Sequence, residues 1–218
     1  MPFHDRTDAG KRLAAALVGY AGRDCVVFAL PRGGVPVAAE VAARLNAPLD
    51  VLLVRKIGTP MQPELAIGAV VDGGTPVYVR NKELLHLTGT SEKEFDRIAR
   101  RELAEIERRR LLYQQGRKPL DPKGRVAIIV DDGIATGATT RAALQATRMR
   151  SPQELVLAVP VAARETLENL REEADRIICL ETPDPFGAVG YFYEDFGQVS
   201  DAEVVTILSK LRTSAREA

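Results

Sequence analysis

The chain has 218 residues, which is enough for one α/β domain with an appendage. Its 30 Lys and Arg balance 30 Asp and Glu, which argues against a DNA-binding protein because such proteins usually carry a basic excess. No apolar run approaches the roughly 20 residues of a membrane span, and the first residues lack the apolar core of a signal peptide. We therefore expect a cytoplasmic protein without a membrane partner.

The first third of the chain alternates helical and strand patterns. We expect an amphipathic helix over 8–20, a strand over 25–30, a helix over 35–45 and a second strand over 49–54. Continuous apolar strands that alternate with helices are typical of a parallel sheet covered by helices on both faces.

The pattern changes after residue 54. Residues 55–65 contain two Pro and one Gly and are expected to form a loop, and short strands over 66–71 and 76–79 are expected to form a hairpin beside the sheet. The longest helical pattern covers 91–115, where arginines alternate with glutamates. This alternation predicts a solvated face or a subunit contact rather than a nucleic-acid surface.

The α/β pattern then resumes to the end of the chain. The remaining expected elements are a strand and helix within 125–149, strands over 154–160 and 176–180, a helix over 163–173, an irregular aromatic stretch over 181–196 and a helix over 200–212. No internal repeat or linker interrupts them, so we expect a single domain over 1–218.

One segment combines two carboxylates with a loop of small residues between a strand and a helix. Asp131 and Asp132 follow the apolar strand directly, and their carboxylates can reach ribose hydroxyls and a metal ion. The following amides and hydroxyls can hold a phosphate at the helix N-terminus, where the helix dipole favours negative charge. The residues of this candidate phosphate loop are Gly133, Ile134, Ala135, Thr136, Gly137, Ala138, Thr139 and Thr140.

Three cations are expected near these carboxylates. Ligands collect at the carboxyl ends of parallel strands, and strand ends at residues 30, 54 and 130 would bring Arg32, Arg55 and Lys56 to the same edge as the two aspartates. The alternative for Arg55 and Lys56 is a solvated strand exit without a role in binding.

The segment Asp131-Asp132-Gly-Ile-Ala-Thr-Gly-Ala-Thr-Thr resembles the 5-phosphoribosyl-1-pyrophosphate (PRPP) signature of type I phosphoribosyltransferases. The chain as a whole is most similar to a bacterial group of predicted phosphoribosyltransferases. The segments that carry this likeness are Asp5–Gly10, Leu30–Gly34, Arg55–Gly58 and Asp195–Asp201. The resemblance implies a three-layer open parallel sheet with a core over about 21–182, a helical insertion over about 81–117, and a hood over about 183–199 that includes N-terminal residues.

The resemblance also implies roles for individual residues. Asp131 and Asp132 would bind the ribose hydroxyls of PRPP and reach Mg²⁺ through water, and Glu64 would act from a mobile loop over 57–65. The pyrophosphate would lie on a loop with a cis peptide between its first two residues, which are followed by two glycines: Pro31, Arg32, Gly33 and Gly34. Arg55 and Lys56 would neutralise the departing pyrophosphate.

The hood is expected to hold the acceptor. Phe186 would stack on a flat heterocycle, with Val189 and Tyr191 beside it. Alternatively, the aromatic residues of this stretch only pack the hood's own core. Hypoxanthine–guanine members carry an aspartate, a candidate general base, at the position of Ala135, and a methyl group cannot accept a proton. The acceptor is therefore left unidentified.

The implied activity is transfer of phosphoribosyl from Mg-PRPP to a nitrogen acceptor, expected to be a nucleobase in nucleotide salvage, by a homodimer. An alternative is a regulatory protein that senses PRPP with little catalysis. Such a protein could also bind RNA through the arginines at 100–101 and 108–110. A PRPP-synthesising enzyme is disfavoured, because no ATP-binding segment is evident.

Overall fold

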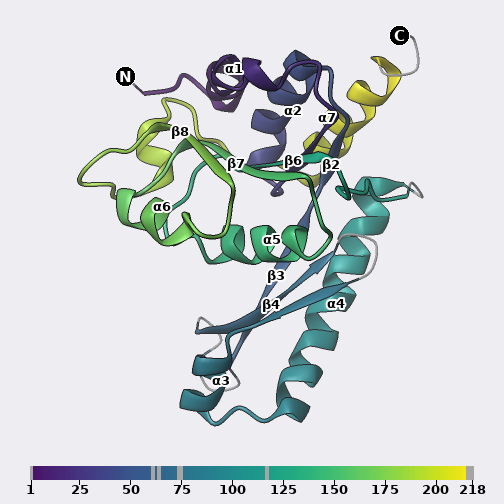
Figure 1. Ribbon diagram of the computed structural model, residues 1–218, viewed down its shortest axis with the longest axis vertical. Helices are drawn as coiled ribbons and strands as arrows, with labels where there is room; N and C mark the ends of the chain where they lie inside the picture. Colours follow the sequence, from purple (N-terminus) through teal and green to yellow (C-terminus); the bar gives the residue numbers. More distant parts are fainter. Residues whose placement is uncertain (1, 60–61, 63–64, 73–75, 116–117, 215–218) are drawn as a thin grey trace.

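A computed structural model describes residues 2–59, 62, 65–72, 76–115 and 118–214 (Figure 1). The helices are α1 (Arg6–Ala16), α2 (Gly34–Leu45), α3 (Lys82–Thr88), α4 (Glu92–Gln114), α5 (Ala138–Arg148), α6 (Arg164–Leu170) and α7 (Asp201–Ser214), with 3₁₀ turns η1 (Val18–Tyr20) and η2 (Val189–Phe192). The strands are β1 (Cys25–Ala29), β2 (Leu49–Val51), β3 (Leu53–Gly58), β4 (Ala66–Asp72), β5 (Val77–Arg80), β6 (Val126–Val130), β7 (Glu154–Val161) and β8 (Arg176–Glu181).

A five-stranded parallel sheet forms the centre of the molecule. Its strand order is β2-β1-β6-β7-β8, and every neighbouring pair is parallel. Every residue of β1 and β6 is buried, as the continuous apolar patterns of these two strands predicted. The predicted α/β fold is confirmed.

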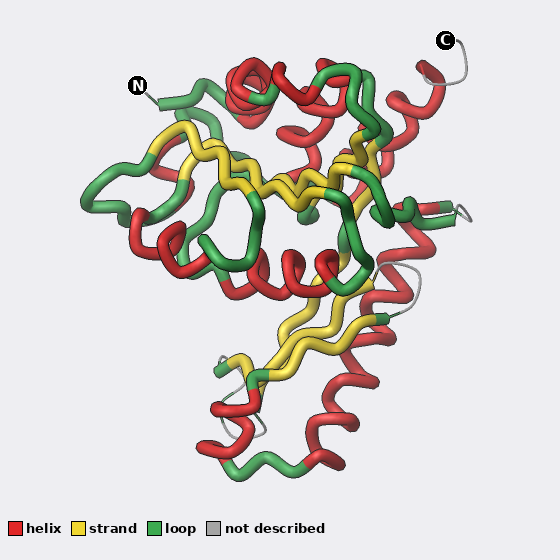
Figure 2. The backbone as a smooth tube through the Cα atoms, viewed as in Figure 1, coloured by secondary structure: helices red, strands yellow, loops and turns green. Residues whose placement is uncertain are grey.

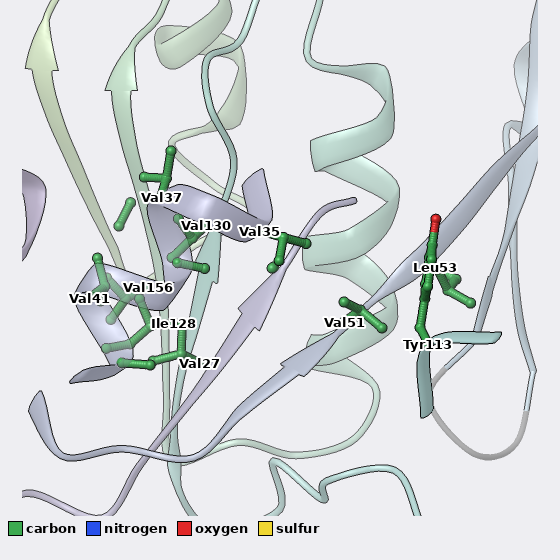
Figure 3. Packing of buried hydrophobic residues seen from close by; sticks show 14 of the residues in the cluster. Val27, Val35, Val37, Val41, Val51, Leu53, Tyr113, Ile128, Val130 and Val156 are labelled. Carbon is green, nitrogen blue, oxygen red and sulfur yellow. The ribbon is translucent and has the colours of Figure 1, made fainter. Parts of the chain in front are cut away.

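Successive strand residues face two separate cores. Val27, Ile128 and Val156 pack against α2 on one face, where Val37 and Val41 join them (Figure 3). The alternate residues of the same strands pack with apolar residues of α5 and α6 on the opposite face. Helices α1, α2 and α7 therefore lie on one side of the sheet and α5 and α6 on the other (Figure 2).

The strand expected over 49–54 is divided between two sheets. The Leu52 amide still donates to the carbonyl of Ala29 at 2.9 Å, which is a bond to the parallel sheet. From Leu53 onward the chain pairs antiparallel with β4, and β3, β4 and β5 form a separate three-stranded sheet. The prediction that Arg55 and Lys56 end a strand of the main sheet was wrong, because both lie inside β3.

Helix α4 covers one side of the three-stranded sheet (Figure 1). It begins with the capping box formed by Ser91 and Glu94, and it buries Phe95, Ile98 and Ile106. The short helix α3 before it is an addition to the expected elements. Within the described ranges, none of the helices combines the length and the apolar character that crossing a bilayer requires.

The N-terminus pairs with the C-terminal hood. The Phe3 amide donates to Phe192 O at 2.8 Å, and the Glu194 amide donates to Phe3 O at 2.9 Å. The rings of Phe3 and Tyr193 lie 5.3 Å apart and are buried with Val161 of β7. This pairing places the start of α1 beside the carboxyl end of the parallel sheet.

Candidate functional site

The loop after β1 packs directly against the acidic pair that follows β6. A side chain at Gly33 would place its Cβ on top of Oδ2 of Asp132, and one at Gly34 would place its Cβ 2.8 Å from the carbonyl oxygen of Val130. Only glycine permits so close an approach. The expected cis peptide between Pro31 and Arg32 is present. Two predicted site segments about 100 residues apart in sequence therefore form one surface.

Arg6 at the start of α1 holds Asp132. Its Nε donates to Asp132 Oδ2 at 2.7 Å, and its Nη1 donates to the carbonyl oxygen of Gly197 at 2.7 Å. The guanidinium also lies 3.9 Å from the ring centre of Phe196. On the other side, the Tyr193 hydroxyl donates to the Asp132 carbonyl oxygen at 2.6 Å. The amino-acid sequence did not predict a role for Arg6. Arg6 belongs to the segment Asp5–Gly10, which carries part of the family resemblance, and this was the one indication of its importance.

The surroundings of the Asp131 carboxyl disfavour its ionised form. Burial, and secondly the negative charge of Asp132, raise the pKa of the Asp131 carboxyl well above its ordinary value. The amide of Asp132 donates to Asp131 Oδ1 at 2.9 Å, which opposes this rise only in part. Ionisation of Asp131 is therefore less favourable than that of an exposed carboxyl, and a nearby cation would make it more favourable.

The candidate phosphate loop is fixed by contacts with β7 and α6. Gly137 adopts φ +73°, and the Thr166 hydroxyl donates to the carbonyl oxygen of Ala135 at 2.5 Å. Ile134 is buried and its amide already donates to Val161 O at 3.0 Å, so this amide has no free hydrogen for a phosphate. Helix α5 begins at Ala138. The amides of its first turn have no helical carbonyl oxygens before them to accept their hydrogen bonds, so they can donate to a ligand.

The three threonines of this loop differ in exposure. Thr136 is exposed and Thr139 is half-buried, whereas Thr140 is only 2% exposed. The hydroxyls of Thr136 and Thr139 are thus better placed to meet a ligand than that of Thr140.

The expected cations come from two parts of the fold: Arg32 from the loop after β1, and Arg55 and Lys56 from β3. Arg32 has Nη1 4.0 Å from Oδ1 of Asp201, the first residue of α7. The hydroxyl of Tyr113 donates to the same oxygen at 2.5 Å, and burial raises the pKa of Tyr113 to about 12. Arg55 and Lys56 reach the start of α5 from β3, because both line one cavity with Thr139. Glu64 lies outside the described residues.

The hood residues are not equivalent. Phe186 lies 5.4 Å from the ring of Phe192, which supports the interpretation that it packs the hood's own core. Val189 lies over Gly133, where an added Cβ would overlap a Val189 methyl group. Tyr191 is 78% exposed. Val189 therefore touches the loop after Asp132.

The parallel sheet with its flanking helices is the fold of type I phosphoribosyltransferases, and the acidic pair and loops lie where strands of that sheet end. The chain belongs to the phosphoribosyl transferase domain family, whose family model matches residues 3–195.

Similar proteins agree with this assignment. The chain is 46% identical over 216 residues to two Mycobacterium tuberculosis proteins, from strains CDC 1551 and H37Rv, that carry the name "Putative phosphoribosyl transferase". The match covers 99% of this chain and 48% of each relative, so the chain spans about half the length of these curated relatives. The crystal structure of TT1426 from Thermus thermophilus is similar with a TM-score of 0.86 and 43% identity, over 97% of this chain and 99% of that chain.

Proposed function

We propose that this chain transfers the phosphoribosyl group of Mg-PRPP to a nitrogen atom of a small heterocyclic acceptor and releases pyrophosphate. The observation that carries the proposal is the packing of Gly33 against Asp132, which joins the glycine loop and the acidic pair into one surface. Membership of the phosphoribosyl transferase family supports the same reaction class.

In this proposal each end of PRPP has its own binding segment. The 5′-phosphate lies on the amides of residues 135–140, where the first turn of α5 offers unbonded N–H groups. Asp131 and Asp132 accept hydrogen bonds from the ribose hydroxyls. The pyrophosphate lies at the Gly33 amide with Arg32 beside it, because the Gly34 amide already donates to Leu30 O at 3.1 Å.

The acidic pair suits Mg²⁺ that is bound mainly through substrate. Two neighbouring carboxylates are hard oxygen donors, and the described residues contain no cluster of three or more His, Cys, Asp or Glu that could enclose a metal. Mg²⁺ usually binds through one or two carboxylates, waters and substrate phosphates. When bound, it would neutralise charge on the pyrophosphate, with Asp131 and Asp132 holding it directly or through water.

The protein's contribution to the reaction is placement and charge stabilisation. The bond between ribose C1 and the pyrophosphate oxygen breaks, the electron pair leaves with pyrophosphate, and the acceptor nitrogen bonds to C1 from the opposite face. Arg32, Arg55 and Lys56 stabilise the leaving group. Ala135 has no group that could take the proton from the acceptor nitrogen, so proton acceptance falls to another group or to water.

A titration with PRPP and Mg²⁺ tests the assignment. The double variant Asp131→Asn, Asp132→Asn should lose binding, because amide groups cannot replace the ionised oxygens. Undiminished affinity of this variant for Mg-PRPP would contradict the proposal. Pyrophosphate release across a panel of nucleobases would then identify the acceptor.

The regulatory alternative makes a different prediction. A PRPP sensor would bind Mg-PRPP but release no pyrophosphate with any acceptor. Its RNA-binding form has less support, because Arg108 and Arg109 of α4 are both paired with Glu105. Salt-dependent retention of RNA without pyrophosphate release would favour it.

A further inference from the structure

We propose that helix α4 forms part of the diphosphate site, with Arg97 and Arg101 as substrate-binding residues and Glu102 as the residue that positions Arg55. This inference rests on the proposed function and adds a second wall to its site. Neither the glycine loop nor the acidic pair contributes these side chains.

The starting observation is a cavity of about 470 Å³ between β3 and α4. Its volume lies within the range of small-molecule sites. The cavity reaches Thr139 of the candidate phosphate loop, so it adjoins the predicted position of PRPP. Its described lining residues are Val54, Arg55, Lys56, Gly58, Thr59, Arg97, Ile98, Arg101, Glu102 and Thr139.

The cavity is strongly cationic. Four of its lining residues carry positive charge and one, Glu102, carries negative charge. Arg97 and Lys56 have no ion-pair partner within 4.0 Å in the part of the chain that the structure describes. Two cations without a close ion-pair partner, in a cavity with an excess of positive charge, favour an anionic ligand. Arg97 also has a longer-range electrostatic interaction with Glu94 of the same helix.

Glu102 holds the two arginines on either side of it. Its Oε2 accepts a hydrogen bond from Nε of Arg55 at 3.0 Å and lies 2.9 Å from Nη2 of the same residue. Its Oε1 accepts from Nε and Nη2 of Arg101 at 3.1 and 3.0 Å. Glu102 itself is 8% exposed. These contacts with a buried carboxylate favour one orientation of each guanidinium group, less strongly for Arg101, whose side chain is 72% exposed, than for Arg55 at 39%.

The helical spacing places a second arginine beside the first. Arg97 and Arg101 are one helical turn apart and therefore share a face of α4. Ile98 in the same turn is buried against the sheet, which anchors this part of the helix. Arg97 and Arg101 line the same cavity as Arg55 and Lys56 of β3. Helix α4 runs beside the sheet that contains β3 (Figure 1).

The ligand chemistry that fits is a diphosphate. Guanidinium groups bind phosphate oxygens through paired N–H donors, and a diphosphate offers enough oxygens for several cations. Arg55 and Lys56, which the proposed reaction assigns to the leaving group, both line the cavity, so it would receive the diphosphate of PRPP and retain the pyrophosphate formed from it.

Inorganic pyrophosphate is the probe for the test, with Mg²⁺ present and calorimetry as the readout. The double variant Arg97→Ala, Arg101→Ala should bind pyrophosphate at least about tenfold more weakly, because two charge-assisted contacts are lost. The control Lys93→Ala, Arg100→Ala removes the same charge from the same helix, but neither residue lines the cavity. It should keep wild-type affinity. Equal affinity in the cavity variant and the wild type would overturn the inference.

The variant Glu102→Gln tests whether Glu102 positions Arg55 and Arg101 or only offsets the positive charge of the cavity. If Glu102 only offsets positive charge, its neutralisation tightens pyrophosphate binding. If it positions Arg55 and Arg101, its neutralisation weakens binding while the thermal unfolding midpoint of the variant confirms a folded chain. Tighter or unchanged binding would contradict the positioning role.

These results are distinguishable from failure of the proposed function. Pyrophosphate binding does not depend on turnover, so the cavity is tested even if no acceptor supports catalysis. A wild-type chain that binds pyrophosphate through Arg97 and Arg101 but releases none from PRPP would retain the inference about the cavity and refute the transferase proposal. A wild-type chain that binds no pyrophosphate would refute the inference.

Discussion

Nε of Arg6 lies 2.7 Å from Oδ2 of Asp132, although 126 positions separate the two residues. The Arg6 side chain is 11% exposed and that of Asp132 is 14% exposed, so the pair is largely shielded from solvent. Arg6 also lowers the pKa of Asp131, against the larger effect of burial. One residue of the N-terminal helix thus acts on both carboxylates of the candidate site.

Arg6→Ala should weaken PRPP binding and destabilise the fold. It leaves the shielded Asp132 carboxylate without its cation, and we expect a loss of about 2–3 kcal/mol in the free energy of unfolding. Chemical denaturation measures this loss, and a titration with Mg-PRPP measures the affinity. Lys11→Ala on the same helix is the control, because Lys11 is exposed. Equal stability of the two variants would show that the ion pair is energetically unimportant.

Gly33→Ala should disrupt the site through a single methyl group. The new Cβ would overlap Asp132 Oδ2, so the loop and the acidic pair must move apart. We expect a loss of at least about 2 kcal/mol in unfolding free energy, with PRPP affinity reduced. At Gly19 an added Cβ meets nothing within 4 Å, so Gly19→Ala should change stability by less than about 0.5 kcal/mol. Retained PRPP binding in Gly33→Ala would argue against the shared surface.

Asp131→Asn should stabilise the ligand-free protein while it abolishes PRPP binding. The pKa of Asp131 is raised in the folded state. Below pH 3.8, the ordinary pKa of this group, the carboxyl is protonated in both the folded and the unfolded chain, so it does not change the free energy of unfolding. As the pH rises above 3.8, the unfolded chain releases this proton while the folded chain retains it, and stability falls until the folded-state pKa is passed. The variant avoids this loss.

The stability difference between Asp131→Asn and wild type should therefore be small near about pH 3 and grow toward neutral pH. Thermal unfolding followed across this pH range measures it. Glu172→Gln, which changes an exposed carboxylate, should show no such growth. A difference that is constant with pH would mean that burial does not raise the pKa of Asp131.

The hood aromatics should respond differently to truncation. Phe186→Ala removes a half-buried ring that packs 5.4 Å from Phe192, and it should lower the unfolding free energy by about 1–2 kcal/mol. Tyr191→Ala removes an exposed ring and should change stability by less than about 0.5 kcal/mol. Once an acceptor is known, KM for that acceptor distinguishes stacking from packing: a raised KM in Phe186→Ala at unchanged stability would restore the stacking role.

The parallel sheet and the position of the acidic pair follow from local patterns in the amino-acid sequence. Fully apolar strands such as Val126–Val130 are buried on both faces, and this pattern is visible without coordinates. The capping box at Ser91 and the glycine loop at Gly33 and Gly34 were predictable for the same reason, because neighbouring residues specify them.

Other side chains of the site are far from the acidic pair in the sequence, and only the tertiary structure shows that they belong to it. The apolar run from Leu49 to Val54 continues across Leu52, so nothing local revealed that the chain leaves one sheet there and joins another. That change of sheet brings Arg55 against Glu102, and the pairing of Phe3 with Phe192 brings Arg6 to Asp132. Contacts of this kind depend on how whole elements pack, and packing between elements is not encoded in the spacing of neighbouring residues.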